Sequence, residues 1–206
     1  MRRLAVVGAG QMGAGIAEVA ARAGVEVMVV EVDAAAADAG HARVASSQRR
    51  AVRAGKVSDE VAGLALERIS FTTDWQALDG ADAAIEAVVE DEHEKRRVFA
   101  ELDACLPDAL FLASNTSSVP IMKLASATKR PERVLGLHFF NPVAVMKLVE
   151  VVPSLMSDPR TVALAQEFAG RVLGKDVIRA PDRAGFVVNA LLVPYLLCAI
   201  RMVEAG

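Results

Sequence analysis

The stretch GAGQMG, residues 8–13, constrains this chain more than any other, because its three glycines lie at fixed spacing between two different elements. It follows the apolar run LAVV and precedes a segment whose apolar residues have helical spacing. Between a strand and a helix, Gly8 permits a tight turn, Gly10 lets the backbone approach a pyrophosphate, and Gly13 lets helix and strand pack closely. Free N–H groups at the start of the helix favour phosphate oxygens. The motif therefore predicts a dinucleotide site.

An acidic residue at the end of the second strand tests this prediction, because glycine turns without a ligand are common. Glu31 ends the run VEVMVVE and lies at the distance beyond Gly13 where the motif requires an acid. Its carboxylate can accept hydrogen bonds from both hydroxyls of a ribose and would repel a 2′-phosphate, so we predict NAD rather than NADP. Asp33, two positions further along on the same face, is a second candidate for this role.

Short β-branched runs alternate with longer helical segments from the N-terminus as far as Asn115. The predicted strands are LAVV, VEVMVVEV, ISFTT, AAIEAVV and ALFLASN, and the predicted helices cover 11–24, 34–54, a segment from 58, and 91–106. Strands that are apolar on both faces and separated by helices indicate a parallel sheet covered on both sides. The predicted fold class is therefore α/β, a Rossmann-type doubly wound and mostly parallel sheet.

The rhythm changes at about Arg133, where VLGLHFF and MKLVEVV are separated by only a few residues, including an Asn-Pro pair. A parallel crossover needs a dozen or more residues, so these two strands should form an antiparallel hairpin. His138 and Glu150 are separated by an even number of positions, and a hairpin centred near residue 144 makes them a directly opposed pair on one face. Such a carboxylate can hold the imidazole in one tautomer and favour its protonated form, which gives a general acid/base. The alternative is a strand histidine bonded only to backbone.

A helix over 159–173, the short strand DVIRAP and an apolar helix from Gly185 complete the predicted fold. The fold class thus includes the late antiparallel hairpin and a C-terminal helix. We divide the chain into an NAD-binding Rossmann-like domain, residues 1–184, and this last helix, residues 185–206.

Three other groups of polar residues have roles that the residues alone leave open. SNTSS, residues 114–118, follows a strand whose carboxyl end faces the ligand crevice, although Ser118 before Pro120 could equally cap a helix. These serines lack the context of a nucleophile elbow, which argues against a serine hydrolase. A basic cluster in residues 49–56 is either a solvated helix face or a site for an anionic ligand. His41 and His93 are interpreted as solvated residues on helix surfaces.

Composition argues against several other classes of protein. The net charge is −3 and no lysine–arginine stripe is interleaved with aromatic residues, so we expect no nucleic-acid partner. Cys105 and Cys198 match neither a metal-binding spacing nor a disulfide framework, so we expect no metal and a reduced, cytoplasmic setting. The N-terminus MRRL does not resemble a signal peptide. The apolar stretch ALLVPYLLCAI is about half a membrane span and contains Pro194, so no membrane association is predicted.

Several motifs in this order carry a resemblance to a known family: GAGQMGAGIA, AIEAVVEDEHEK, SNTSS, HFFNP, Glu150 and GFVVN. Together they resemble the NAD-binding domain of the L-3-hydroxyacyl-CoA dehydrogenases, and most of all the bacterial 3-hydroxybutyryl-CoA dehydrogenases. The resemblance covers essentially all 206 residues. It implies a homodimeric oxidoreductase of fatty-acid or butanoate metabolism. The reaction would be hydride transfer between NAD and the C3 hydroxyl or keto group of a short-chain acyl-CoA.

The resemblance also implies roles for individual residues. His138 would be the catalytic acid/base, Glu150 its orienting partner, and Ser117 and Asn141 would contact the reacting oxygen of the substrate. The remaining implied contacts are Asn189, Ser47 and Lys56 with the substrate, and Gly8, Gly10, Gln11, Met12, Gly13, Glu31, Glu90, Lys95 and Asn115 with the cofactor. Ser47 and Lys56 rest on a loose match of residues 46–56 to the region that binds CoA.

The chain departs from the family at its end, because family members continue beyond the equivalent of Gly206 as a helical domain. That domain helps to close the active site and makes the dimer contact. The resemblance therefore implies that residues 185–206 are the linking first helix of a truncated C-terminal helical domain, and we expect this truncated form still to bind NAD. Its last helix would leave apolar side chains such as Leu191 and Leu196 partly exposed. Two rival functions remain, a non-catalytic dinucleotide-binding module and a dehydrogenase of a free hydroxy acid.

Overall fold

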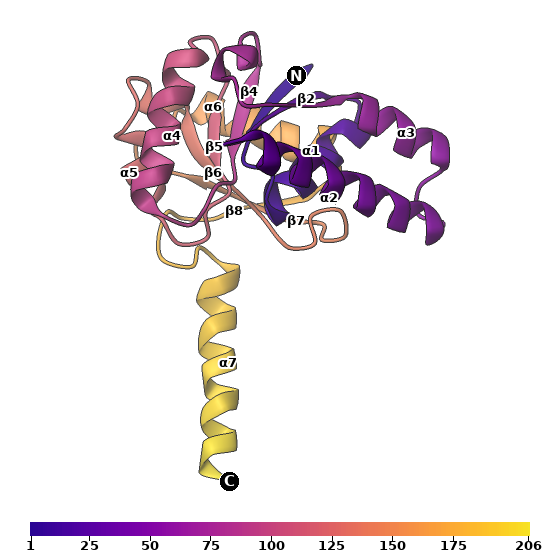
Figure 1. The fold of residues 1–206 in the computed structure, drawn as a ribbon. Coiled ribbons are helices and arrows are strands. Elements are labelled where there is room, and N and C mark those ends of the chain that lie inside the picture. The colour runs from indigo at the N-terminus through magenta and orange to yellow at the C-terminus, as the bar shows by residue number, and fades with distance from the viewer.

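The computed structural model describes all 206 residues and shows one eight-stranded sheet with helices on both faces (Figure 1). The strands are β1 (Arg3–Val7), β2 (Glu26–Val30), β3 (Ile69–Thr72), β4 (Ala83–Glu86), β5 (Leu112–Ser114), β6 (Val134–Phe139), β7 (Leu148–Pro153) and β8 (Asp176–Arg179). Their order is β3-β2-β1-β4-β5-β6-β7-β8, and neighbours from β3 to β6 pair in parallel. The predicted Rossmann-type doubly wound sheet is confirmed.

Apart from a short helix at 121–125, the helices follow the strands in the order that the apolar periodicity predicted. They are α1 (Gln11–Arg22), α2 (Ala34–Arg53), α3 (Asp59–Glu67), α4 (Glu92–Cys105), α5 (Ile121–Ala125), α6 (Pro159–Glu167) and α7 (Val188–Ala205), with short turns η1 (Trp75–Leu78) and η2 (Pro131–Arg133) and a π-helical turn η3 (Phe168–Val172). Side chains cap the N-termini of several helices. Ser58 accepts a hydrogen bond from the Val61 N–H before α3, and Asp91 accepts one from the Glu94 N–H before α4. The helix predicted over 159–173 corresponds to α6 followed directly by η3.

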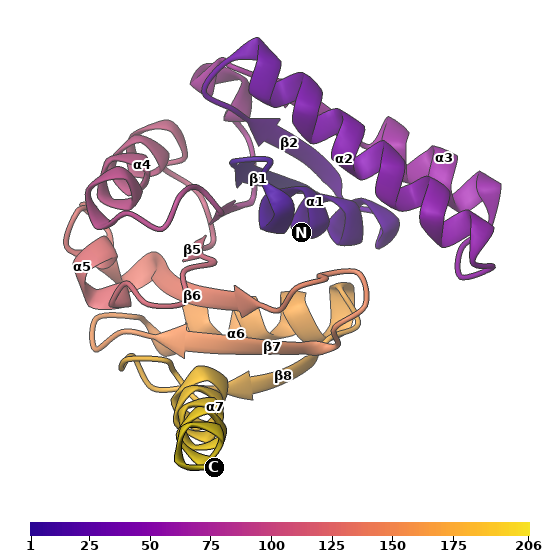
Figure 2. The same cartoon turned by 60° about the horizontal axis from the view of Figure 1, so that its bottom comes forward.

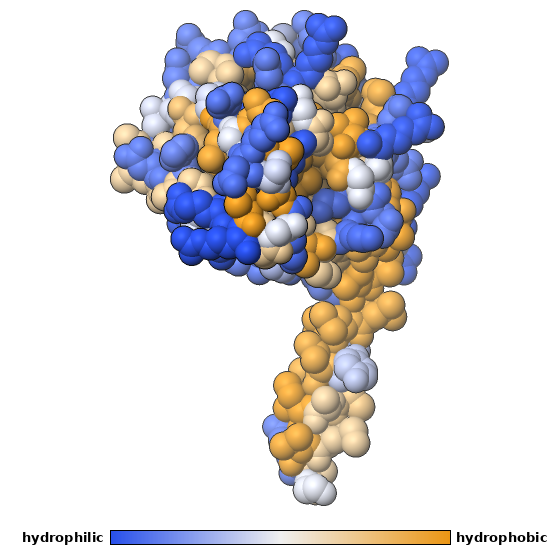
Figure 3. Space-filling model, turned by 90° about the vertical axis from the view of Figure 1, so that its right-hand side faces the viewer, coloured by the Kyte–Doolittle hydropathy of each residue, from blue (hydrophilic) through white to orange (hydrophobic).

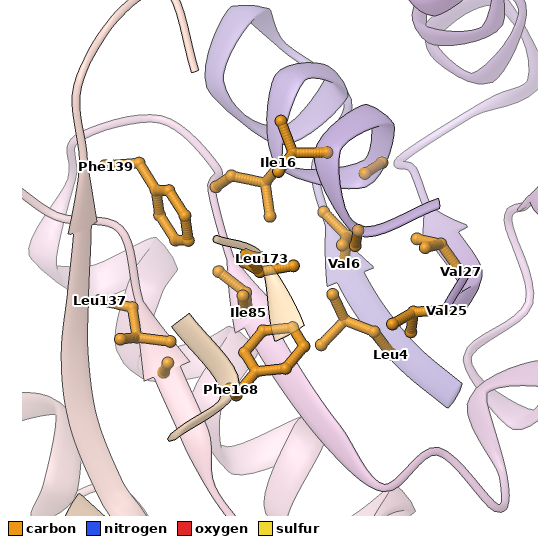
Figure 4. Packing of buried hydrophobic residues seen from close by; sticks show 14 of the residues in the cluster. Leu4, Val6, Ile16, Val25, Val27, Ile85, Leu137, Phe139, Phe168 and Leu173 are labelled. Atoms are coloured by element: carbon orange, nitrogen blue, oxygen red, sulfur yellow. The ribbon is translucent and has the colours of Figure 1, made fainter. Parts of the chain in front are cut away.

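Two apolar layers hold the helices on the sheet. On one face, Ile16 of α1 and Phe168 of η3 pack over Leu4 and Val6 of β1 and Ile85 of β4 (Figure 4). The opposite face is covered mainly by α4 and α5, whose apolar side chains include the fully buried Phe99, Leu102 and Leu124. Burying each such side chain contributes about 1.5–3 kcal/mol to stability. Helices α2 and α3 pack on α1 rather than on the middle of the sheet (Figure 2).

The last three strands reverse direction as the short connection predicted. β6 and β7 pair antiparallel with His138 directly opposite Glu150, so the predicted hairpin and its register are confirmed. β8 then pairs parallel with β7, so these two strands both run against the rest of the sheet. The carboxyl ends of β1, β4, β5 and β6 consequently meet at one edge, beside the start of β7.

The C-terminal helix differs from its predicted position. α7 begins at Val188 rather than Gly185, because Gly185 and Phe186 have φ values of +73° and +49° and form a turn. The helix projects from the body of the molecule with no buried residue, and its surface is largely apolar (Figures 1 and 3).

α7 also bears on the prediction of no membrane segment. Its 18 residues have a mean hydropathy of 1.5, so one helix is long and apolar enough to cross a membrane by length and composition alone. These two properties do not distinguish a spanning helix from one that packs against other helices.

Candidate active site

The glycine turn between β1 and α1 has the geometry that its three glycines allow. Gly8 has φ +92°, and a β-carbon there would lie 2.9 Å from the Ala87 carbonyl oxygen. A β-carbon at Gly13 would overlap the Gly8 carbonyl, so only glycine lets α1 lie this close to the turn. The space above Gly10 is open for 4 Å, which leaves its backbone accessible to a ligand at the start of α1.

A cavity of about 610 Å³ opens beside this turn and contains the predicted acid. It is lined by Gly8, Gly10 and Glu31, together with side chains that include Trp75 and Arg97. The Glu31 carboxylate accepts hydrogen bonds from the N–H groups of Ala9 and Val32. Nothing in the spacing of the sequence pointed to Trp75 or Arg97, because the turn after β3 and helix α4 reach this cavity only in the folded chain.

Asp33, the second candidate for the ribose, has a different position and contact. Its side chain accepts a hydrogen bond from the Ala36 N–H at 2.7 Å and so caps the start of α2. It does not line the cavity that contains Glu31.

A second cavity, of about 370 Å³, lies at the carboxyl ends of β4, β5 and β6. It brings together residues from both ends of the chain, from Met12 to Asn189. Eight of the predicted site residues line it, namely Met12, Glu90, Lys95, Asn115, Ser117, His138, Asn141 and Asn189. Asn115 is also fixed in place, since its side chain accepts from the Phe139 N–H at 2.9 Å.

The histidine and glutamate at this pocket form a buried hydrogen-bonded pair. His138 Nδ1 lies 2.6 Å from Glu150 Oε2, and the two residues are 6% and 0% exposed. With a carboxylate at Nδ1, the proton of the neutral ring resides there and Nε2 is left for the pocket. The other carboxylate oxygen, Oε1, accepts from the N–H groups of Val187 and Val188 at 3.0 and 2.9 Å. The hairpin register predicted the pair but gave no signal for this contact with the start of α7.

Glu90 organises the SNTSS loop after β5. Its Oε1 atom accepts from the Thr116 hydroxyl at 2.5 Å, the Ser118 hydroxyl at 2.8 Å, and the N–H groups of Ser117 and Ser118 at 2.9 and 3.0 Å. Burial raises the pKa of the Glu90 carboxyl, but the hydrogen bonds and the charge of Lys95 outweigh it and lower that pKa to about 2. The Ser118 hydroxyl therefore bonds to Glu90 and does not cap a helix, since α5 begins without a side-chain cap.

Lys95 is buried between two carboxylates. Its Nζ lies 2.6 Å from Glu86 Oε1 and 3.2 Å from Glu90 Oε2, and Glu86 also accepts from the Ser114 hydroxyl at 2.6 Å. Sequence reasoning missed Glu86, although a carboxylate inside the apolar run AAIEAVV is a signal that such a residue has a partner.

A groove of about 780 Å³ lies between α1, α2 and the loop from β6 to β7. Its polar lining includes the predicted Ser47 and Gln11, together with Arg43 and Arg50, which lie two helical turns apart on one face of α2. Asn141 lines both this groove and the second cavity, which contains His138 and is called the reaction pocket below, so the two spaces adjoin. Lys56 lies outside the groove, exposed in the turn after α2. Of the predicted basic cluster, the groove therefore contains only Arg50.

The cavity that contains Glu31 and the pocket that contains His138 together fit a nicotinamide dinucleotide. The open backbone at Gly10 suits a pyrophosphate, the Glu31 cavity suits an adenosine ribose, and the pocket with His138 lies across the turn where the second nucleoside would reach. No group of three or more His, Cys, Asp or Glu side chains is arranged to hold a metal ion.

A dinucleotide cavity that adjoins a pocket with a buried His–Glu pair is the arrangement expected of a nicotinamide-dependent dehydrogenase. Residues 3–183 match the family model described as "3-hydroxyacyl-CoA dehydrogenase, NAD binding domain". The chain therefore belongs to the 3-hydroxyacyl-CoA dehydrogenase family, and it is an NAD-dependent dehydrogenase.

Individual relatives agree with this family. The chain is 61% identical to a 3-hydroxybutyryl-CoA dehydrogenase of Mycobacterium tuberculosis, over all of this chain and 72% of that protein. A probable 3-hydroxybutyryl-CoA dehydrogenase of Bacillus subtilis is 40% identical, over all of this chain and 71% of its own length. Among solved structures, FadB2 of M. tuberculosis matches with a TM-score of 0.97 at 60% identity, over all of this chain and 73% of that one.

Proposed function

We propose that this protein interconverts a short-chain 3-hydroxyacyl-CoA, such as 3-hydroxybutyryl-CoA, and its 3-keto form, with His138 and Glu150 as the acid/base pair. The observation that carries the proposal is the 2.6 Å bond between His138 Nδ1 and a fully buried Glu150, in a pocket that adjoins the dinucleotide cavity. The identity to 3-hydroxybutyryl-CoA dehydrogenases supports the choice of substrate.

Proton transfer is assigned to the imidazole. During oxidation, His138 Nε2 accepts the proton of the C3 hydroxyl, and in the reverse direction it returns that proton to the keto oxygen. Glu150 stabilises the imidazolium that forms, and the bonds from the Val187 and Val188 N–H groups to its other oxygen hold the carboxylate in place. Such proton transfer contributes roughly 10²–10⁴-fold to the rate. When bound, NAD supplies the acceptor for the hydride that leaves C3.

Three polar side chains at the mouth of the pocket would orient the reacting oxygen. Ser117, Asn141 and Asn189 come from three separate elements and line the same cavity as His138. Lys95, Glu90 and Asn115 are assigned to the nicotinamide half of the cofactor, and Gln11 and Met12 to the turn at the start of α1. Holding C3 in line with the hydride acceptor accounts for most of the catalytic effect.

The adjoining groove is proposed to hold the CoA moiety. Arg43, Arg50 and Ser47 present positive charge and hydroxyl groups there, which suits phosphate oxygens. Lys56, exposed beyond the end of α2, would contact CoA only where the nucleotide extends out of the groove.

We also propose the domain division, the assembly and the setting of this protein. Residues 1–184 form the NAD-binding domain, and 185–206 begin a helical domain. This division is supported by the family match that ends at 183 and by the absence of any buried residue in α7. A homodimer through such helices and a cytoplasmic setting accord with the apolar surface of α7 and with the metabolic relatives.

Reduction of acetoacetyl-CoA by NADH, followed at the absorbance of NADH, tests the function directly. We expect turnover with acetoacetyl-CoA and none with free acetoacetate. Turnover of free acetoacetate alone would indicate a dehydrogenase of hydroxy acids, and tight NADH binding without any turnover would indicate a non-catalytic module.

The variant His138→Gln tests the acid/base role. We expect turnover to fall by roughly 10²–10⁴-fold while NADH affinity is retained, because glutamine cannot exchange the proton. His41→Gln, at an exposed position on α2, is the control and should remain fully active. Loss of NADH binding in His138→Gln, measured by fluorescence titration, would contradict the assignment.

A further inference from the structure

The segment that joins β8 to α7 reaches the acid/base pair in a strained conformation. Phe186 has φ +49° and is the only residue besides glycines with a positive φ. For a bulky side chain this conformation is strained and persists only where the surroundings impose it. Gly185 before it has φ +73°, and a β-carbon there would lie 2.8 Å from the Ala190 nitrogen. We therefore expect contacts of Phe186 with its neighbours to stabilise this backbone conformation.

The ring of Phe186 packs against the imidazole. Its centroid lies 5.5 Å from that of His138 in an edge-to-face arrangement, and the residue is only 4% exposed. Phe140 provides a second ring, with its centroid 4.6 Å from the imidazole. Two aromatic neighbours restrict rotation of the imidazole and keep water from its buried side.

The same turn directs the start of α7 at the carboxylate. The N–H groups of Val187 and Val188, the two residues after Phe186, donate to Glu150 Oε1 at 3.0 and 2.9 Å. Glu150 Oε2 is thereby left for His138 Nδ1. Asn189, the next residue, lines the reaction pocket. Every residue from Phe186 to Asn189 thus contacts the imidazole, the carboxylate or the pocket.

The far end of the segment is also fixed. The Asp182 carboxylate accepts hydrogen bonds from the N–H groups of Ile121 and Met122, both at 2.9 Å. The segment is therefore held at α5 on one side and at Glu150 on the other, with the strained turn between them.

We infer that Phe186 is a positioning residue for the acid/base pair, an inference that rests on the function proposed above for His138 and Glu150. Its ring fills the space beside the imidazole, and its left-handed backbone turns the next two N–H groups toward Glu150 Oε1. Without the ring, the imidazole can rotate and water can enter. Both changes weaken the bond between Nδ1 and Oε2 and misplace Nε2 relative to the substrate.

The variant Phe186→Leu isolates the ring, because leucine has the same steric cost in the left-handed backbone conformation of this position. We expect kcat for acetoacetyl-CoA reduction to fall roughly 10- to 100-fold, the scale of a misplaced catalytic group, with unchanged KM and unchanged NADH affinity. The far-downfield proton resonance of His138 Nδ1–H should broaden or disappear from the NMR spectrum. Phe186→Tyr retains the ring and should restore both kcat and the resonance.

Phe168→Leu is the matched control, since Phe168 is equally buried and packs against Phe111 instead of His138. It should lower stability and leave kcat and the resonance unchanged. Phe186→Met, whose unbranched side chain adapts more easily to the space that the ring leaves, replaces the leucine variant if that variant does not fold.

Full kcat and an intact resonance in Phe186→Leu would overturn the inference, and so would equal losses in Phe168→Leu. An inactive wild-type protein would contradict the proposed function instead. In that case the His138 Nδ1–H resonance alone tests the positioning role, which requires that the resonance broaden or disappear in Phe186→Leu and persist in Phe168→Leu.

Discussion

Glu90 is the single residue whose ionisation the fold shifts most clearly. Burial raises its pKa, but the hydrogen bonds of the SNTSS loop and the charge of Lys95 lower it from the usual 4.5 to about 2. A folded-state pKa below the unfolded value means that ionised Glu90 stabilises the protein above about pH 4.5. That contribution is lost as the pH falls toward 2.

Urea unfolding between pH 2 and 6 should show this loss, and Glu90→Gln should flatten that part of the stability profile. Glu60→Gln, which removes an exposed carboxylate on α3, should leave the profile unchanged. If the stability profile of Glu90→Gln equals that of the unmodified protein, the loop does not stabilise the ionised carboxylate of Glu90.

Glu31 should set the preference for NAD over NADP. Its carboxylate lies in the dinucleotide cavity, where it would bond the ribose hydroxyls and repel a 2′-phosphate. Glu31→Ala should reduce the ratio of NADH to NADPH affinity by roughly 10- to 100-fold, because hydrogen bonds to charged groups are worth about 1.5–3 kcal/mol.

Fluorescence titration with the two cofactors measures this ratio. Asp33→Asn is the control, since asparagine also caps helices well and should keep both α2 and the preference. A loss of preference in Asp33→Asn instead of Glu31→Ala would move the role to Asp33.

At the scale of elements, the contact between α1 and the glycine turn should depend on Gly13. The methyl group in Gly13→Ala would overlap the Gly8 carbonyl, so α1 must shift away from the turn. We expect weaker NADH binding and a lower free energy of unfolding. Gly63→Ala, in the middle of α3 with open space around it, should instead stabilise the protein by about 0.5–1 kcal/mol. Urea unfolding and NADH titration of the two variants check both expectations.

Apolar periodicity predicted the main elements because α1, α4 and α6 bury one face on a sheet that is apolar on both sides, while α2 and α3 bury theirs mainly against α1. It missed α5, η1 and η2, which are too short to show a period. The same pattern predicts a start of α7 at Gly185, which is too early, because Gly185 and Phe186 continue the apolar pattern while their φ values break the helix.

At the scale of the whole molecule, the projecting α7 should cause association. None of its residues is buried, and large apolar side chains such as Leu196, Leu197 and Ile200 are about half exposed. Apolar surface of this kind marks an interaction site. Sedimentation velocity should show oligomers whose fraction rises with protein concentration.

Replacing Leu196 and Ile200 by Gln should shift this equilibrium toward the monomer. NADH binding should be retained, since both positions lie beyond the first turn of α7, where Asn189 meets the pocket. A monomer at all concentrations in the unmodified protein would contradict the proposed assembly.

The sequence by itself determined the parts of this protein that depend on short-range spacing. The glycine turn, Glu31 at the end of the second strand, and the opposed pair of His138 and Glu150 all follow from strand and helix periods. The motifs shared with the family supplied the proposed roles of the further site residues and the proposed substrate.

Only the tertiary structure decided the contacts between segments that no local period relates. The second oxygen of Glu150 bonds to the start of α7, Glu90 gathers the SNTSS loop, and Lys95 is buried between two carboxylates. Lys56 lies outside the groove for the same reason. Asp33, by contrast, caps α2 through a local contact with the Ala36 N–H. Side-chain partners across a fold depend on how whole elements pack, and the spacing of residues along the chain does not contain that information.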